Sequence, residues 1–208
     1  MFKSASAAAV LALACVVATA TATAQMLPPA HFGISAGGTI PTGEFKADQF
    51  GDGFKTGWQG MVILEFRGPK KHLGLRVDVG SGENAANDQL NSDITAAAGF
   101  PVTVKMRGLG GNLDLVYNLG RAKKRGGGAY LLGGVGAHRL TLSETSQGVT
   151  VDSSETKFAW NAGGGLSFPV AGVKAFLEAR YFNVETSFDA SGKLPYVAVM
   201  AGVRFGGD

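Results

Sequence analysis

The sequence predicts an all-β fold: an eight-stranded antiparallel up-and-down transmembrane β-barrel preceded by a cleavable signal peptide. Four observations lead to this prediction. Eight segments alternate between apolar and polar side chains with the period of two that is typical of strands. Long and short connections alternate between the segments, and aromatic residues gather at the segment ends. Glycine makes up 32 of the 208 residues, roughly twice its usual share, and glycine weakens helices.

An alanine- and valine-rich stretch precedes the first of these segments. It ends at Ala22 and Ala24, which have the spacing of a signal-peptide cleavage site. We therefore expect residues 1–24 to be a signal peptide and residues 25–208 to be one β-barrel domain, with an uncleaved anchor helix as the alternative. Cleavage would remove Cys15, the only cysteine, and with it disulfides and thiolate metal sites.

The predicted strands are each about ten residues long, which is the length that a tilted strand needs to cross a membrane. No later stretch offers the roughly 18 uncharged apolar residues of a membrane helix, so the chain can cross a membrane only as a closed barrel. In chain order, the strands are predicted at residues 31–41, 55–66, 70–82, 102–118, 129–142, 157–168, 173–185 and 195–205.

In the first three segments all the large apolar side chains but two, Met61 and Ile63, fall on one face, and the opposite face carries Gln59, Glu65 and Arg76. A soluble sheet would turn the apolar face to a core, whereas a membrane barrel turns it to lipid and keeps the charges in the lumen. The expected lipid face comprises Phe32, Ile34, Ala36, Gly38, Ile40, Trp58, Gly60, Val62, Leu64, Phe66, Leu73, Leu75, Val77 and Val79.

The fourth segment changes phase along its length. Its second part has an apolar face opposite Asn112 and Asp114, but its first part, VTVKM, alternates in the opposite phase. A β-bulge, which inserts one extra residue into a strand, is therefore expected near residues 108–111. The fifth segment does not reveal which of its faces is apolar. The apolar face of the fourth comprises Leu109, Leu113, Leu115 and Tyr117.

The last three segments return to regular alternation. Their polar faces carry Asn161, Lys174, Glu178, Arg180 and Arg204. Their expected lipid face comprises Phe158, Trp160, Ala162, Leu166, Phe168, Val173, Ala175, Leu177, Ala179, Tyr181, Val197, Val199, Ala201, Val203 and Phe205.

Connection lengths and aromatic residues both distinguish two ends of the barrel. The long connections are predicted at residues 42–54, 83–101, 143–156 and 186–194, as expected for the outer side of an outer-membrane barrel. Aromatic side chains at both ends are predicted to form girdles at the two membrane interfaces, with ordinary core aromatics as the alternative. The predicted girdle residues are Phe66, Tyr117, Tyr130, Phe168 and Phe205 at the short turns, and Trp58, Phe158, Trp160 and Tyr181 at the long loops.

The lumen of an eight-stranded barrel is just wide enough for side chains to fill it, so charges inside must pair with one another. We therefore predict an ion-pair network that plugs the lumen. A gated small pore and a hydrophobic-ligand channel with a side exit are the alternatives. The predicted lumen network comprises Glu65, Arg76, Asp78, Asn112, Asp114, Lys174, Glu178, Arg180 and Arg204.

Together these patterns resemble the OmpA/OmpW-type outer-membrane β-barrel domain of bacteria, over nearly all of the mature chain. The resemblance is carried by GISAGGTIPTGEF, YLLGGVGAH, EARYFNV and VAVMAGVRF. It implies a location in the bacterial outer membrane, contact with its lipid, and insertion by the barrel-assembly machinery. Family members usually end on an aromatic residue that this machinery reads, whereas here Phe205 is followed by three further residues.

The sequence indicates no catalytic, cofactor or metal site. The glycine-rich residues 133–138 and 163–165 lack the following helix of a phosphate-binding loop, and the three histidines lack metal-ligand spacing. Outer-membrane lipid A deacylases are also eight-stranded barrels. They carry a histidine and a serine where this chain has Asn183 and Glu185, so the base and hydroxyl of nucleophilic catalysis are missing.

We therefore expect a non-enzymatic outer-membrane barrel with a structural role, a surface-interaction role, or a role as a small-solute pore. An extracellular partner would bind through the long loops, and a net charge of only +3 gives no indication of nucleic-acid binding. The first alternative is a soluble secreted lipocalin-like barrel that binds a ligand. The second is a lipid-modifying enzyme, which the missing histidine and serine disfavour.

Overall fold

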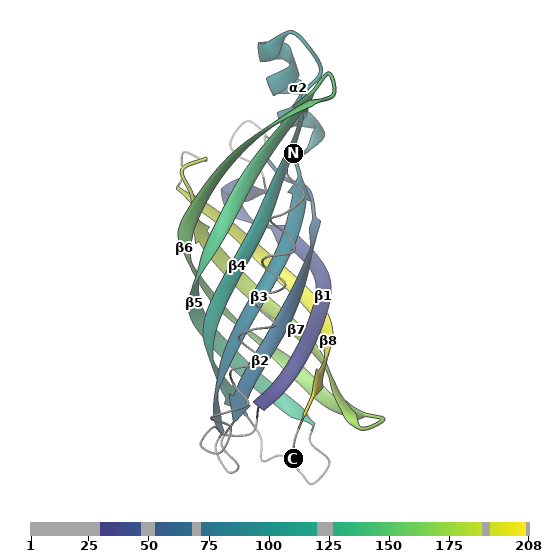
Figure 1. The fold of residues 1–208 in the computed structure, drawn as a ribbon, viewed down its shortest axis with the longest axis vertical. Helices are drawn as coiled ribbons and strands as arrows, with labels where there is room; N and C mark the ends of the chain where they lie inside the picture. The colour runs from purple at the N-terminus through teal and green to yellow at the C-terminus, as the bar shows by residue number, and fades with distance from the viewer. Residues whose placement is uncertain (1–29, 47–52, 68–71, 120–126, 189–191, 207–208) are drawn as a thin grey trace, which may run out of the picture.

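A computed structural model describes residues 30–46, 53–67, 72–119, 127–188 and 192–206, and the predicted signal peptide lies outside these residues. Eight antiparallel strands form a closed barrel in which each strand pairs with its neighbours in the chain and β8 pairs with β1, as predicted (Figure 1). The strands are β1 Ala30–Pro41, β2 Gly57–Arg67, β3 Leu73–Ala85, β4 Thr103–Asn118, β5 Gly128–Ser146, β6 Val149–Val170, β7 Val173–Glu185 and β8 Lys193–Phe205.

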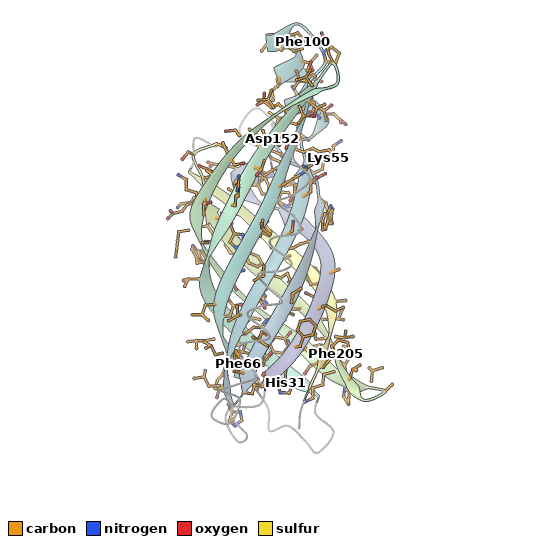
Figure 2. The ribbon with its side chains drawn as sticks, viewed as in Figure 1. His31, Lys55, Phe66, Phe100, Asp152 and Phe205 are labelled. Carbon is orange, nitrogen blue, oxygen red and sulfur yellow. The ribbon has the colours of Figure 1, made fainter. Side chains whose placement is uncertain are left out.

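The barrel turns its apolar side chains outward and its charges inward. Leu75 and Leu177 are 41% and 52% exposed, whereas Arg76 and Glu178, their neighbours in sequence, are buried inside the barrel. Figure 2 shows side chains projecting from the outer wall along the height of the barrel. No helix among the described residues is long and apolar enough to cross a membrane.

Strand β4 contains no bulge, so that part of the prediction is wrong. Its pairing with β3 and β5 runs without interruption through Gly108 and Gly111. Even-numbered residues point inward along the whole strand, and it is the polarity of the two faces that changes. From Leu109 toward the short turn that follows β4, the outward side chains are apolar. Toward the start of the strand, at the outer end of the barrel, Arg107 is exposed outside and Met106 is buried inside. This inversion is expected of a strand that leaves a membrane between Arg107 and Leu109, because a wall in water carries polar side chains outside and apolar side chains inside.

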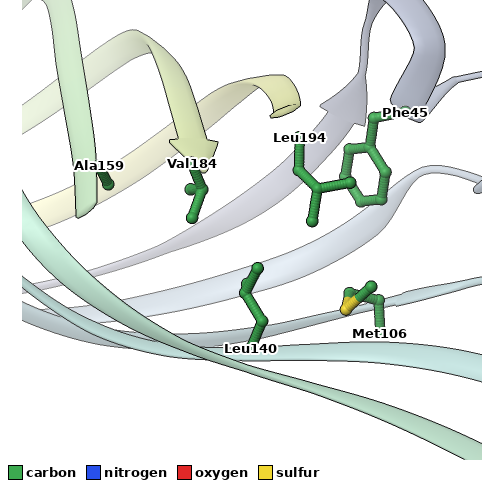
Figure 3. Close-up of a cluster of buried hydrophobic side chains, with 6 residues drawn as sticks. All are labelled: Phe45, Met106, Leu140, Ala159, Val184 and Leu194. Carbon is green, nitrogen blue, oxygen red and sulfur yellow. The ribbon is translucent and has the colours of Figure 1, made fainter. Parts of the chain in front are cut away.

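Above this level the barrel encloses an ordinary hydrophobic core. Figure 3 shows its six buried side chains, which come from strands on several sides of the barrel and from the short helix η1, Gly43–Phe45. Burial of apolar area from water stabilises this part by the usual hydrophobic effect, which the lipid-embedded part cannot use on its outer face. The cluster comprises Phe45, Met106, Leu140, Ala159, Val184 and Leu194.

Two of the predicted long connections differ from the structure. The predicted loop at 143–156 is a continuation of β5 and β6, which meet at a two-residue turn of Gln147 and Gly148. Both turn residues have positive φ, which is the conformation of the tight hairpin turn that matches strand twist. The connection after β3 contains a helix, α2, at Asp88–Ala98. Figure 1 shows α2 and the β5–β6 hairpin at the same end of the barrel, beyond the ends of the other strands.

Candidate functional site

The lumen at mid-height is crossed by ion pairs between opposite walls of the barrel. Arg76 on β3 binds Asp78 through Nε at 2.6 Å and Glu178 on β7 through Nη1 at 2.7 Å. Arg180 contacts three carboxylates: Glu178 at 2.6 Å, Asp78 at 2.6 Å and Asp114 on β4 at 3.0 Å. All five side chains are fully buried.

The network continues toward the short-turn end through Arg204. Its Nη1 lies 3.2 Å from Glu65, and its Nη2 lies 3.9 Å from Glu178. The guanidinium also lies over two aromatic rings, 4.8 Å from the ring centre of Tyr130 and 4.5 Å from that of Phe176. Such cation–π contacts become stronger when the cation is desolvated.

We define the ion network as Glu65, Arg76, Asp78, Asp114, Glu178, Arg180 and Arg204. Its four carboxylates face three buried guanidiniums, and half-buried Arg67 forms a further ion pair with Glu65, so the charges balance. Balance matters because an unpaired charge in a desolvated site is costly. Removing one partner of a buried ion pair typically lowers the stability of the fold by about 3–5 kcal/mol. Lys174, also predicted here, lies half-buried on the inner face of β7.

Neutral side chains complete the hydrogen bonding of the ion network. The Tyr130 hydroxyl donates to Glu178 at 2.6 Å, and the Asn161 side-chain amide donates to Asp114 at 2.8 Å. Asn112, also a predicted member of the network, instead bonds His138 at 3.0 Å. Sequence analysis misses Tyr130 and Asn161 as partners because alternation gives the face of a side chain and not its neighbour across the lumen.

The predicted placement of Tyr130 in an aromatic girdle is wrong. Its side chain is only 1% exposed and points into the lumen, because β5 turns its even-numbered residues inward. The other predicted girdle residues lie exposed or half-exposed on the outer wall, and Figure 2 labels Phe66 and Phe205 near the short-turn end. Their contact with the membrane interfaces stays a prediction. These residues are Trp58, Phe66, Tyr117, Phe158, Trp160, Phe168, Tyr181 and Phe205.

A small cavity lies among side chains of the apolar core and polar side chains next to it. It offers about 50 Å³ to the centres of water molecules and is lined by Gln59, Asn112 and His138 among others. Gln59 Oε1 and Asn112 Nδ2 are buried without a hydrogen-bond partner among the residues that the structure describes. Because one water needs roughly 10–15 Å³ of such space and several polar partners, this cavity suits a few ordered waters.

Strand β6 has an open backbone edge at the outer end of the barrel. Its pairing with β7 begins only at Ala159, whereas its pairing with β5 reaches Val149 beside the hairpin turn. The side chains of Thr186 and Ser187 contact Glu155 and Lys157. No described strand therefore pairs with residues 149–154 on the side that faces away from β5.

Comparison with known proteins agrees with this architecture. The family model of the outer membrane protein beta-barrel domain matches residues 6–206. A search of curated protein sequences finds no match.

Several solved structures share the fold at low sequence identity. Neisserial surface protein A is 14% identical, covers 84% of this chain and 95% of its own, and superposes with a TM-score of 0.52. The attachment invasion locus protein Ail of Yersinia pestis is 14% identical over 86% of this chain and 100% of its own, with a TM-score of 0.52. A major outer membrane protein of Thermus thermophilus is 16% identical to this chain. The match covers 85% of this chain and 99% of that protein, with a TM-score of 0.51. This chain therefore belongs to the outer membrane protein β-barrel domain family, and its strands cross the bacterial outer membrane.

Proposed function

We propose that this protein is a non-enzymatic outer-membrane barrel with a closed lumen, whose outer end binds partners at the cell surface. The observation that carries the first half is the ion network, in which Arg76 and Arg180 on opposite walls share the carboxylates of Asp78 and Glu178. The barrel then acts as an anchor, and the parts above the membrane interact with other molecules. The outer-membrane location argues against a soluble lipocalin-like protein.

The geometry of the ion network supports a plug more than a pore. Its ion pairs join β3 and β4 to β7 across the lumen, so a hydrated ion would have to break several charge-assisted hydrogen bonds to pass. The apolar core above adds a second barrier without polar groups to replace the hydration shell. Removing a buried ion from water costs several kcal/mol or more, which makes spontaneous passage slow.

In planar lipid bilayers, we expect the wild-type barrel to show no single-channel steps. A double variant, Arg76→Ala with Glu178→Ala, removes one cation and one anion that bind each other. We expect this variant to show small ohmic steps, because a water-filled path replaces the two side chains. Arg107→Ala with Glu83→Ala is the matched control, since this ion pair lies on the outer wall, and it should stay silent. Reproducible steps in the wild type would show that the protein is a pore.

The open edge of β6 supports the second half of the proposal. In a two-residue hairpin the flanking residues, here Ser146 and Val149, form a hydrogen-bonded pair. The backbone N–H and C=O groups of alternate residues from Thr150 onward therefore point away from β5, and no described strand pairs with them. Such an edge can accept an extended segment as an added strand. We propose an extended peptide segment of an extracellular protein as the partner class.

This binding mode can be tested with a displayed library of random peptides selected on the barrel in lipid nanodiscs. We expect the enriched peptides to bind at least about tenfold more weakly to Ser154→Pro, because proline removes one edge N–H without removing a hairpin hydrogen bond. Ser154→Ala removes the same hydroxyl contact to Thr141 and should bind normally. Equal binding to wild type, the proline variant and the alanine variant would exclude strand addition at this edge.

Outer-membrane lipid and the barrel-assembly machinery are the other partners that we propose. The outward apolar side chains of all eight strands supply the lipid contact. Phe205, at the end of β8, supplies an aromatic residue on the strand that closes the barrel against β1.

The names of two similar structures describe a surface protein and an attachment protein. At 14% identity their likeness concerns the fold alone, so the proposal depends on the geometry described above.

A further inference from the structure

The outer mouth of the barrel contains an apolar pocket that the ion network and the open edge of β6 do not use. Its volume is about 270 Å³, which is larger than an engineered cavity of roughly 150 Å³ that binds benzene. The wall is built mainly from side chains of η1, α2, β4, β5 and the connection before β8. The apolar lining includes Phe45, Phe54, Leu90, Ile94, Leu142 and Phe188.

Two carboxylates are the only charged groups among the described residues that line this pocket. Glu44 lies on η1 and Glu144 lies on β5. Both side chains are exposed to solvent, and neither forms an ion pair or hydrogen bond with another described residue. The nearby acids Glu83 and Glu155 differ in this respect, because basic residues or hydroxyl donors bind both. Among the described residues, therefore, none competes with a ligand for the two carboxylates of the pocket.

We propose that this pocket binds a small amphipathic amine, with its apolar body against the aromatic and aliphatic wall and its ammonium group at Glu44 and Glu144. The charge of the rim argues for this class over others. A fatty acid or another organic anion would be repelled by two carboxylates, and a neutral apolar molecule would leave both of them unused. The pocket is apolar with few polar groups, which is the usual composition of a small-molecule site.

The pocket lies above the level at which the strands leave the membrane. Val104 and Met106, which line it from β4, precede the polarity inversion at Arg107. A ligand therefore reaches the pocket from the external medium and does not have to cross the ion network. The inference is independent of whether the lumen conducts.

The test uses the full barrel in phosphatidylcholine nanodiscs with ¹³C-labelled isoleucine methyl groups, and tryptamine as the probe. Ile94 lines the pocket, Ile63 is buried inside the barrel, and Ile34 faces lipid. We expect tryptamine to shift the Ile94 signal saturably and to leave Ile63 unchanged. Indole-3-propionate, which carries a carboxylate on the same ring system, and neutral 3-ethylindole should not shift Ile94 at the same concentrations.

A double variant, Glu44→Gln with Glu144→Gln, should weaken tryptamine binding about two- to thirtyfold, since two exposed ion pairs are lost. Asp93→Asn on the exposed side of α2 is the matched control and should bind as the wild type does. The proposal is overturned by equal shifts with all three indoles, by a shift confined to Ile34, by the absence of saturation at Ile94, or by unchanged binding in the double variant. Heat-modifiable gel migration verifies that each variant is folded.

Discussion

Replacing Arg180 by methionine is expected to lower the free energy of unfolding by about 3–5 kcal/mol. Arg180 is fully buried and contacts Asp78, Asp114 and Glu178, so its loss leaves three carboxylates short of a cation in a desolvated lumen. Methionine is an apolar side chain of similar length. The decrease in the free energy of unfolding therefore results mainly from the missing charge and less from a change in side-chain volume. Urea unfolding of the barrel in lipid vesicles, followed by tryptophan fluorescence, measures the change.

Two further variants make this measurement decisive. Arg107→Met breaks an exposed ion pair with Glu83 and should change stability by less than about 1 kcal/mol. Combining Arg180→Met with Asp114→Asn removes one of the orphaned charges and should recover part of the loss. A cost for Arg180→Met as small as that for Arg107→Met would mean that water screens the ion network, and the proposal of a plugged lumen would then fail.

The orientation of the network side chains is predictable from sequence because it depends only on alternation. Arg76 and Asp78 are two residues apart in a strand and so must share a face. Which charges meet across the lumen depends on the shear of the barrel and on strand order, and no local pattern contains either. The pairing of Arg180 with Asp114, for example, joins β7 to β4, which are not neighbours in the barrel.

Two errors of the sequence analysis, the bulge in β4 and the loop at residues 143–156, share one cause, namely that the outer end of the barrel stands in water. VTVKM at the start of β4 suggests a phase change of the backbone, but the environment changes along this strand and the backbone does not. The hairpin around Gln147 and Gly148 resembles a loop in sequence because its outward side chains are polar. A sequence search for strands whose apolar face changes sides along their length would identify both the outer part of β4 and the β5–β6 hairpin.

Helix α2 carries local signals that strand alternation does not reveal. Asn87 caps its first turn by accepting a hydrogen bond from the Leu90 N–H, and Gly99 ends it in the left-handed conformation with φ of 78°. Leu90 and Ile94 are four residues apart and lie on the face that packs on the core. The pocket that these two residues line is beyond sequence reasoning, since its other walls come from distant strands.

The placement of glycine inside the barrel leads to the second large effect. Gly134 of β5 faces the lumen opposite Asp114 of β4. A Cβ atom there would overlap the Leu113 carbonyl oxygen and the Asp114 side chain, and a backbone oxygen in a paired strand cannot move away. Gly134→Ala is therefore expected to cost about 3 kcal/mol or more, at the upper end of overpacking.

Gly133→Ala is the matched control, one residue away on the outer face. Its Cβ would lie 3.5 Å from the nearest atom, the Asn161 carbonyl oxygen, which is ordinary contact. The expected change is within about 1 kcal/mol, and it can be a gain because alanine restricts the unfolded chain. Urea unfolding of both variants in the same vesicles gives the comparison. Equal costs at the two positions would show that strand conformation alone explains them. A cost confined to Gly134 would instead locate the strain at Asp114, where a displaced carboxylate would also lose its contact with Arg180.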